Sequence, residues 1–197
     1  MPLPKEKERY TYTDYITWDD NERWELIYGV PYMMAPPSLP HQGISLELSR
    51  QLGNFLQNKP CKVFTAPIGV RLTADANDDT VLQPDIVVVC DYAKLDNKGV
   101  IGAPDMVVEI LSPSTARVDR FEKFRIYESA GVREYWIVDP ESRTAQVHIL
   151  DNEKFNFIKT YRDNETVPVH VLDGCTISLP DTFPDSPFPD SLQTSSP

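Results

Sequence analysis

Two carboxylates lie in stretches of sequence whose neighbouring residues are almost all apolar. Asp85 precedes the run Ile-Val-Val-Val, and Glu109 follows Met-Val-Val in a second run further along the chain. Such runs are typical of buried strands, where a charge is costly unless it is paired or bound to a metal ion. If the two runs form neighbouring strands, the carboxylates meet at one edge of the sheet and offer oxygen ligands suited to magnesium. Two unrelated ion pairs, or strand-end acids that face solvent, are the alternative.

A lysine occupies a position where a helix is expected to be apolar. The periodicity of residues 116–130 predicts a helix that ends at Gly131. Within it, Lys123 lies three residues before Ile126 and four before Tyr127, in an apolar stripe. Such a lysine either extends its ammonium group to the surface or is held inward by a carboxylate. Asp119, four residues earlier, would give a simple salt bridge, whereas Glu109 or Asp85 would give a functional one.

The remaining pattern predicts a mixed α/β (α+β) fold, in which a mixed central sheet is flanked by helices. The chain begins with an N-terminal hairpin around Gly29 and ends with additional antiparallel strands. Helices are expected at 13–20, 39–58 and 116–130, and strands at 23–34, 61–66, 68–72, 83–89, 103–112, 134–139, 144–150, 155–161 and 167–172.

The length of 197 residues suits one domain. We expect a flexible N-terminus at 1–10, a single domain over 11–179, and a disordered tail rich in Pro, Ser and Asp at 180–197. No apolar run approaches the roughly 20 residues needed to span a bilayer, and no hydrophobic segment follows the N-terminal charges as in a secretory signal. A cytoplasmic location without membrane contact is therefore expected.

The cysteines bear on the cellular compartment, and the net charge bears on the affinity for nucleic acid. Cys61, Cys90 and Cys175 are far apart and form no Cys-x-x-Cys pair, which favours reduced, buried thiols in the cytoplasm. A net charge of −11 disfavours nonspecific affinity for nucleic acid. Segment 117–133 nevertheless has a small excess of basic residues, which leaves room for a local basic groove.

Two further residues are weaker candidates for the site. His41 lies near the start of a predicted helix, three residues before Ile44, where a histidine is more often a partly buried structural residue. Gln83, two residues before Asp85, could face the same side of its strand and contact water or substrate. Ser112 and Ser114 lack the Gly-x-Ser-x-Gly frame of a serine hydrolase and are better suited to capping the next helix.

Several motifs together resemble one protein family. Asp85 and the sequence Glu-Ile-Leu at 109–111 resemble the PD-(D/E)xK nuclease core without its terminal lysine. The longer set resembles the Uma-two family of proposed restriction endonucleases, which is abundant in cyanobacteria. This set comprises Trp-Glu-Leu-Ile-x-Gly at 24–29, Met-Ala-Pro-Pro-Ser at 34–38, His41, Pro-Asp-Met-Val-Val-Glu-Ile-Leu-Ser-Pro-Ser-Thr at 104–115, Asp119…Lys123…Tyr127, and Gly-Val-Arg-Glu-Tyr-Trp-Ile-Val-Asp-Pro at 131–140.

The resemblance assigns roles to individual residues. Asp85 and Glu109 would bind the metal ion, with the Ile110 carbonyl as a third ligand. Leu111 stands where the usual lysine would be, and Lys123 would supply the ammonium group from the adjacent helix. Glu25 would be the auxiliary acid that nucleases of this fold often bring from the N-terminal region.

The resulting hypothesis is a magnesium-dependent endonuclease, with manganese as the alternative ion, that hydrolyses DNA phosphodiester bonds. The resemblance implies a restriction-endonuclease-like fold and no further cofactor. A homodimer is plausible, because cleavage of both strands of a duplex needs two active sites. The alternatives are a catalytically silent nucleic-acid-binding or interaction module, favoured by the acidic charge, and a nuclease that acts on RNA.

Overall fold

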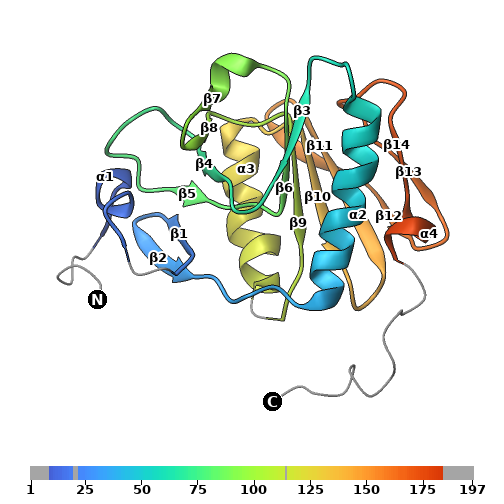
Figure 1. Ribbon diagram of the computed structural model, residues 1–197, viewed down its shortest axis with the longest axis horizontal. Helices are drawn as coiled ribbons and strands as arrows, with labels where there is room; N and C mark the ends of the chain where they lie inside the picture. Colours follow the sequence, from blue (N-terminus) through green and yellow to red (C-terminus); the bar gives the residue numbers. More distant parts are fainter. Residues whose placement is uncertain (1–8, 20–21, 114, 184–197) are drawn as a thin grey trace.

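The computed structural model describes residues 9–19, 22–113 and 115–183. Residues 1–8 of the expected flexible segment 1–10, and residues 184–197 of the expected tail, lie outside the described residues. Tyr10, the last residue of the segment 1–10, is buried in an apolar cluster with Tyr12 and Leu26. The chain runs from α1 (Tyr12–Tyr15) and the hairpin of β1 (Trp24–Ile27) and β2 (Val30–Met33) at one end of the molecule to β13 (Thr166–Pro168) and β14 (Thr176–Ser178) at the other (Figure 1). None of the helices in these ranges is long and apolar enough to cross a membrane.

The described strands form two larger sheets and the small pair β13–β14. The hairpin sheet has the order β2-β1-β5-β4-β8-β7, with β5 (Val81–Leu82), β4 (Gly69–Arg71), β8 (Gly99–Ile101) and β7 (Leu95–Asp96). The central sheet has the order β12-β11-β10-β9-β6-β3, with β12 (Lys154–Arg162), β11 (Thr144–Asp151), β10 (Glu134–Asp139), β9 (Met106–Ile110), β6 (Ile86–Val89) and β3 (Lys62–Thr65).

The two strands that carry the predicted carboxylates are neighbours in the central sheet. β6 and β9 are antiparallel and pair Ile86 with Val108. Continuing this register by one residue places Asp85 opposite Glu109, so both side chains leave the same face of the sheet. β9 and β10 are parallel, and the connection between them contains the π-helical turn η2 (Val118–Lys123) and α3 (Phe124–Ala130). Gly131, with φ of 89°, ends α3 in the left-handed conformation that favours glycine.

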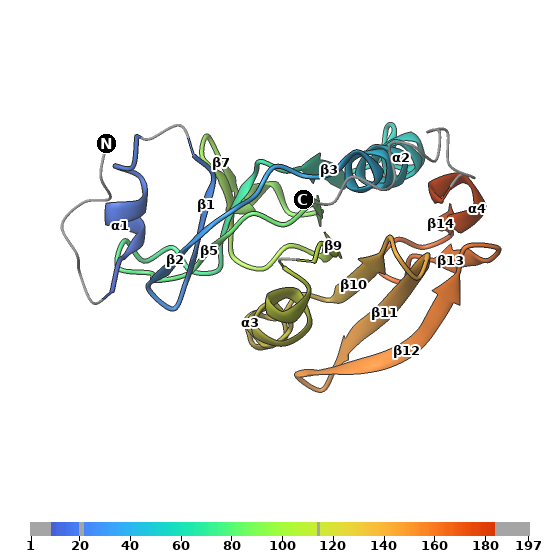
Figure 2. The same ribbon diagram turned by 90° about the horizontal axis from the view of Figure 1, so that it is seen from below.

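Two helices cover opposite faces of the central sheet, as Figure 2 shows. The apolar stripe of α2 (Leu39–Leu56) packs on the face that carries Val88 and Val108. The α3 helix packs on the face that carries Val87 and Val107, the same face as Asp85 and Glu109. Because every residue of β6 and β9 is buried, both faces of these strands are apolar, which explains their continuous runs of Val and Ile.

Most predicted elements are present, with five corrections. The strands form two larger sheets instead of one central sheet, and the expected helix at 13–20 is shortened to α1. The predicted helix at 116–130 starts with a π-helical turn. The predicted strand at 167–172 is limited to β13. The segment 180–183, assigned to a disordered tail, belongs to α4 (Leu179–Thr182) and to the buried Phe183 that packs on the core.

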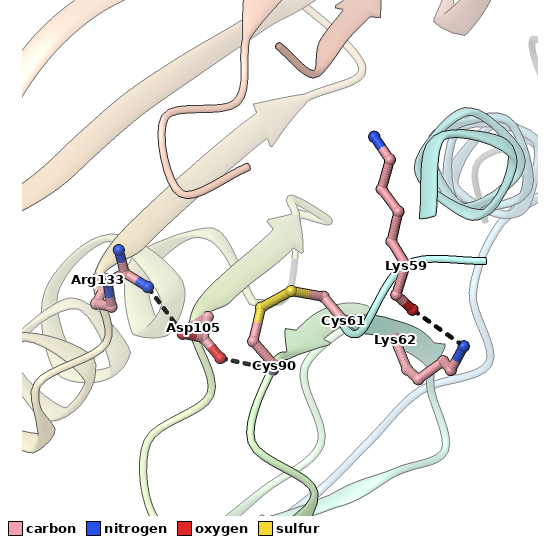
Figure 3. Close-up of a disulfide and its surroundings, with 6 residues drawn as sticks. All are labelled: Lys59, Cys61, Lys62, Cys90, Asp105 and Arg133. Atoms are coloured by element: carbon pink, nitrogen blue, oxygen red, sulfur yellow. Dashed lines mark hydrogen bonds and ion pairs between the residues drawn. A yellow bond between two sulfur atoms is a disulfide. The ribbon is translucent and has the colours of Figure 1, made fainter. Parts of the chain in front are cut away.

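The expectation of reduced cysteines is wrong for two of the three. Cys61 and Cys90 form a disulfide that joins the start of β3 to the end of β6, whereas Cys175 is free and buried. Figure 3 shows the disulfide beside Asp105, whose carboxylate accepts hydrogen bonds from the Cys90 amide and from Arg133. Sequence spacing could not show this pairing, because it depends on the antiparallel register of β3 and β6. Disulfides are rare in a reducing cytoplasm, so the cytoplasmic location stays a prediction.

We expect the Cys61–Cys90 disulfide to stabilise the central sheet. It closes a loop with a sequence separation of 29 residues, for which chain entropy gives roughly 3 kcal/mol. The double substitution Cys61→Ser/Cys90→Ser should therefore lower the free energy of unfolding by about this amount in urea titrations without reductant. In dithiothreitol the wild-type and the variant should unfold alike, and a difference that persists there would assign the effect to packing instead.

Candidate active site

Asp85 and Glu109 lie where β6 begins and β9 ends. The Asp85 carboxylate accepts a hydrogen bond of 2.7 Å from the Ile110 amide, which fixes its orientation across the two strands. Glu109 is almost completely buried, with 3% of its surface exposed. Figure 1 shows that α2 and the π-helical turn begin at the same end of the central sheet. The two predicted carboxylates therefore share a position that both flanking helices can reach.

Lys123 points inward and contacts three carboxylates. Its Nζ lies 2.9 Å from Glu25 Oε1, 3.1 Å from Glu109 Oε1 and 3.2 Å from Asp119 Oδ1. The lysine is 2% exposed, so it does not extend to the surface. The sequence left a local salt bridge to Asp119 and a functional contact to Glu109 as alternatives, and the structure contains both.

The π-helical turn brings Asp119 and Lys123 to the same side of the helix. Both residues are buried, at 1% and 2% exposure, and the Tyr135 hydroxyl donates a hydrogen bond to the Asp119 carbonyl. The wider turn of a π-helix occurs mainly as a short interruption and is frequent at functional sites. Phe121, on the other side of the turn, is exposed. The π-helical geometry therefore directs a charged pair, not an apolar pair, toward Glu109.

Burial controls the protonation of this cluster. Burial raises the pKa of Glu109 well above its ordinary value, although the Lys123 ammonium acts in the opposite direction. Burial also raises the pKa of Asp119, again against the effect of Lys123. For Lys123 itself, burial lowers the pKa, but the nearby carboxylates outweigh this effect and the net pKa is well above the ordinary value. Lys123 therefore stays positively charged and faces three acidic side chains, more than its single charge can balance.

Tyr127 adds a hydroxyl donor to the cluster. Its hydroxyl donates a hydrogen bond of 2.7 Å to Glu109 Oε1, the oxygen that also contacts Lys123. Burial and the nearby carboxylates raise the pKa of Tyr127 well above its ordinary value, which keeps the hydroxyl protonated. The sequence pattern favoured a core role for this residue. It is fully buried, but it also orients Glu109.

Glu25 reaches the cluster from the hairpin sheet. It is buried in β1, and its Oε1 accepts a hydrogen bond of 2.7 Å from the Gln83 amide in addition to its contact with Lys123. The Gln83 side chain instead binds Arg23, the Tyr15 hydroxyl and the Trp24 carbonyl. Gln83 thus contributes to the site through its backbone, and its side chain is occupied by structural contacts.

His41 extends from the first turn of α2 to Asp85. Its Nε2 lies 3.2 Å from Asp85 Oδ2, and both side chains are mostly buried. Burial lowers the pKa of His41, but the hydrogen bond to Asp85 and an interaction with the Ile110 backbone outweigh it and raise the pKa overall. Within the described part of the chain, His41 Nδ1 is buried without a hydrogen-bond partner. The predicted auxiliary histidine therefore lies beside the predicted metal ligands.

The donor groups fit a hard divalent cation that keeps part of its water shell. Among the described residues, no three side chains of His, Cys, Asp and Glu are arranged to hold a metal ion. The available donors are the Asp85 and Glu109 carboxylates, on paired strands, and the Ile110 carbonyl. Magnesium is commonly held by one or two carboxylates with several waters, so this donor set suits it without a complete protein cage.

Two of the basic residues in segment 117–133, for which the sequence left room in a basic groove, are paired with acids. Arg120 contacts Asp139 and Gln146, and Arg133 contacts Asp105. Asp119, which the sequence suggested only as a simple partner of Lys123, is a residue of the candidate site that pattern reasoning missed. The spacing of four residues was a signal for the ion pair, but helical periodicity could not show that both residues would be buried together with Glu25.

Comparisons with known proteins agree with this architecture. A sequence model of the Uma2 family, described as "Putative restriction endonuclease", matches residues 12–180. An uncharacterized protein of Synechocystis sp. (strain ATCC 27184 / PCC 6803 / Kazusa) is 31% identical over 132 residues, which cover 66% of this chain and 68% of the relative. A second uncharacterized protein of the same strain is 25% identical over 121 residues, covering 60% and 67%.

A solved structure shares the fold. The crystal structure described as "a putative nuclease belonging to DUF820 from Anabaena variabilis ATCC 29413" aligns with a TM-score of 0.70 and 19% identity, and covers 88% of this chain and 97% of that one. At this identity the likeness concerns the fold alone, a mixed α/β architecture with mixed sheets. The family match over 12–180 is more specific: the chain belongs to the Uma2 family.

We expect Asp119→Asn to stabilise the protein at neutral pH. The raised pKa of Asp119 means that its charged form is penalised in the folded state. This penalty is absent below the unfolded-state pKa, near 3.8, and grows as the pH rises above it. Removing this surplus buried charge while Lys123 keeps two carboxylates should add on the order of 1 kcal/mol at pH 7.

Urea unfolding across a pH series measures this effect. The difference between Asp119→Asn and wild type should shrink as the pH falls toward 3.8. Glu122→Gln, an exposed acid in the same π-helical turn, is the matched control and should leave the stability nearly unchanged. If Asp119→Asn were less stable than wild type at pH 7, burial of the Lys123 charge would require all three carboxylates, and Asp119 would not be a surplus charge.

Proposed function

We propose that this protein is a metal-dependent endonuclease of the PD-(D/E)xK type that hydrolyses DNA phosphodiester bonds. The observation that carries the proposal is the contact of 3.1 Å between Lys123 Nζ and Glu109 Oε1. It supplies an ammonium group to a strand whose usual lysine position is held by Leu111, and Asp85 lies on the neighbouring strand. The family match and the fold of the DUF820 neighbour support this reading.

In this proposal Asp85, Glu109 and the Ile110 carbonyl hold magnesium, or manganese in its place. The ion, when bound, polarises a phosphoryl oxygen and lowers the pKa of a bound water. The protein's own groups then position the reaction. Lys123 stabilises the negative charge that develops on the phosphate or orients the attacking water. Tyr127 holds Glu109 through the bond to Oε1, which the lysine also contacts.

DNA is the proposed substrate, and RNA is the alternative within the same reaction. Two strand cuts in a duplex need two active sites, so we also propose a homodimer as the active form. The net charge of −11 implies that substrate binding depends on local groups and on the metal ion more than on the overall field.

One observation favours a second candidate, a nuclease fold that binds nucleic acid or protein without turnover. Lys123 is 2% exposed and contacts three carboxylates, so a phosphate can reach its ammonium group only after one of these contacts opens. A protein in which none of these contacts opens would keep the fold but could not catalyse phosphodiester hydrolysis.

We expect Asp85→Asn and Lys123→Met to abolish cleavage, because each removes one half of the proposed chemistry. The loss should be at least on the order of 100-fold, the effect of removing one preorganised electrostatic group. Cleavage is measured on plasmid, linear duplex, single-stranded DNA and RNA with magnesium or manganese. Lys154→Met, which removes a surface lysine paired with Glu128, is the matched control and should keep full activity.

The outcomes separate the two candidates. Wild-type cleavage that both variants lose supports the nuclease. No cleavage of any substrate with any of these metals, together with a gel shift that persists in EDTA, supports the silent binding module. Wild-type activity that survives in Lys123→Met would overturn the role of the lysine. Sedimentation of the wild type in the presence of duplex DNA then tests the dimer.

A further inference from the structure

Three carboxylate oxygens converge on one point in the interior. They belong to Glu25 in β1, Glu109 in β9 and Asp119 in the π-helical turn, and all three lie within 3.2 Å of Lys123 Nζ. The three acids are between 1% and 4% exposed. Three separate elements from two sheets and a helix therefore deliver negative charge to a single position that solvent hardly reaches.

Lys123 donates a hydrogen bond to Glu109, whereas its contact with Asp119 is purely electrostatic. Asp119 Oδ1 lies 3.2 Å from Nζ, yet the direction of approach is not that of a hydrogen bond, and this buried oxygen has no other partner among the described residues. This oxygen therefore faces the charge of Lys123 without a hydrogen bond, and the carboxylate is also stabilised by a side-chain hydrogen bond from Thr115. An ammonium group has three protons to donate. The Tyr127 hydroxyl also donates a hydrogen bond to Glu109, and the backbone amide of Gln83 donates one to Glu25.

The cluster has more acidic groups than basic groups, which also favours a cation site. One ammonium faces three carboxylates, and burial of an unbalanced charge is costly. The three carboxylates around Nζ therefore leave room for more positive charge than the lysine provides. A divalent cation would balance the three acids better than an ammonium group does.

We propose that Glu25, Glu109 and Asp119 form a cation site whose resident ion is the Lys123 ammonium, and that removal of this ammonium opens the site to a hard divalent cation. In the native protein Lys123 then takes the place of a second metal ion, and the chain holds one divalent cation. Glu25 and Asp119 are positioning residues for Lys123. The catalytic meaning of the proposal rests on the proposed nuclease function, but the cation site itself depends only on this geometry.

The exchange requires the carboxylates to move inward, because no three such side chains of the described residues are arranged to hold a metal ion in the present geometry. Oxygen ligands lie about 2.0–2.6 Å from magnesium or calcium, so each carboxylate oxygen must move inward by roughly 0.3–1.2 Å from its present distance to Nζ. Truncation of Lys123 to alanine also removes the side chain that fills the approach to this point, which leaves volume for the water molecules that such ions keep.

The test is the number of manganese ions bound by the full-length protein, measured by isothermal titration calorimetry and by electron paramagnetic resonance. We expect Lys123→Ala to bind one more Mn²⁺ per chain than the wild type. The same increase is expected in the Asp85→Asn background, where the proposed catalytic metal site is removed. An equal stoichiometry with and without Lys123 in both backgrounds would overturn the cation site.

This design separates the inference from the proposed function. A wild type that binds no Mn²⁺ contradicts the metal site of Asp85 and Glu109, whereas the increase on removal of Lys123 tests only the second site. Two matched variants locate the added ion. Lys123→Ala/Asp119→Asn should lose it, because one of the three carboxylates is neutralised, and Lys154→Ala should gain none. An added ion that persists after Asp119→Asn would contradict the assignment.

Folding of the variants is part of the test. Lys123→Ala leaves three buried acids without a counter-ion, so its melting temperature should fall without metal and rise with Mn²⁺ by more than that of the wild type. Lys123→Gln keeps much of the side-chain volume without charge and should show a smaller rise. If Mn²⁺ restored no stability to Lys123→Ala, the divalent cation could not replace the ammonium and the proposal would fail.

Discussion

The buried ammonium group of Lys123 is the constraint on which the site depends. Its three acidic partners come from the hairpin sheet, the central sheet and the helix between β9 and β10. Any one of these carboxylates would be costly to bury alone, and the lysine would be as costly without them. The contact therefore ties the position of β1 to the end of β9 and to the π-helical turn, and an error in any of the three leaves an unpaired charge in the interior.

The lysine of the candidate site lies on the helix, as Lys123, and not at position 111 of the strand. This placement has a structural consequence. Leu111, at the strand position, is buried among the apolar residues under α3, and its amide bonds to the Val138 carbonyl to continue the pairing of β9 with β10. A lysine at position 111 would have to bring its charged end out of this apolar layer. From the helix, Lys123 instead approaches Glu109 from the covering side, together with Tyr127 one turn later. The helix thus provides both the cation and the hydroxyl that orient one carboxylate.

The sequence was most informative where local pattern and long-range contact agree. The runs that flank Asp85 and Glu109 are buried strands that pair with each other, because only a strand covered on both faces keeps Val and Ile at successive positions. The position of Lys123 in an apolar stripe left two alternatives, extension to the surface or an inward side chain, and the structure has the inward one. These predictions needed only periodicity and the cost of burying charge.

The sequence was least informative where a contact depends on register between distant segments. The strands β5, β7 and β8 are two or three residues long, too short for a periodic signal, so the separate hairpin sheet could not be predicted. Cys61 and Cys90 become neighbours only through the pairing of β3 with β6. The π-helical turn and the burial of Asp119 depend on the cluster itself, because no local preference places two charged residues in an apolar layer.

Glu109 connects the two parts of the site. Its Oε1 faces Lys123 and Tyr127, while its strand neighbour Asp85 faces His41 and the Ile110 amide. If Glu109 also binds the proposed metal ion, attraction to that ion weakens its attraction to Lys123, and by linkage the lysine contact weakens metal binding by the same factor. One of the three carboxylate contacts of Lys123 would then open toward a phosphate when the metal is in place. The surplus of carboxylates keeps Lys123 charged and enclosed until that exchange, which reconciles its burial with a role in chemistry.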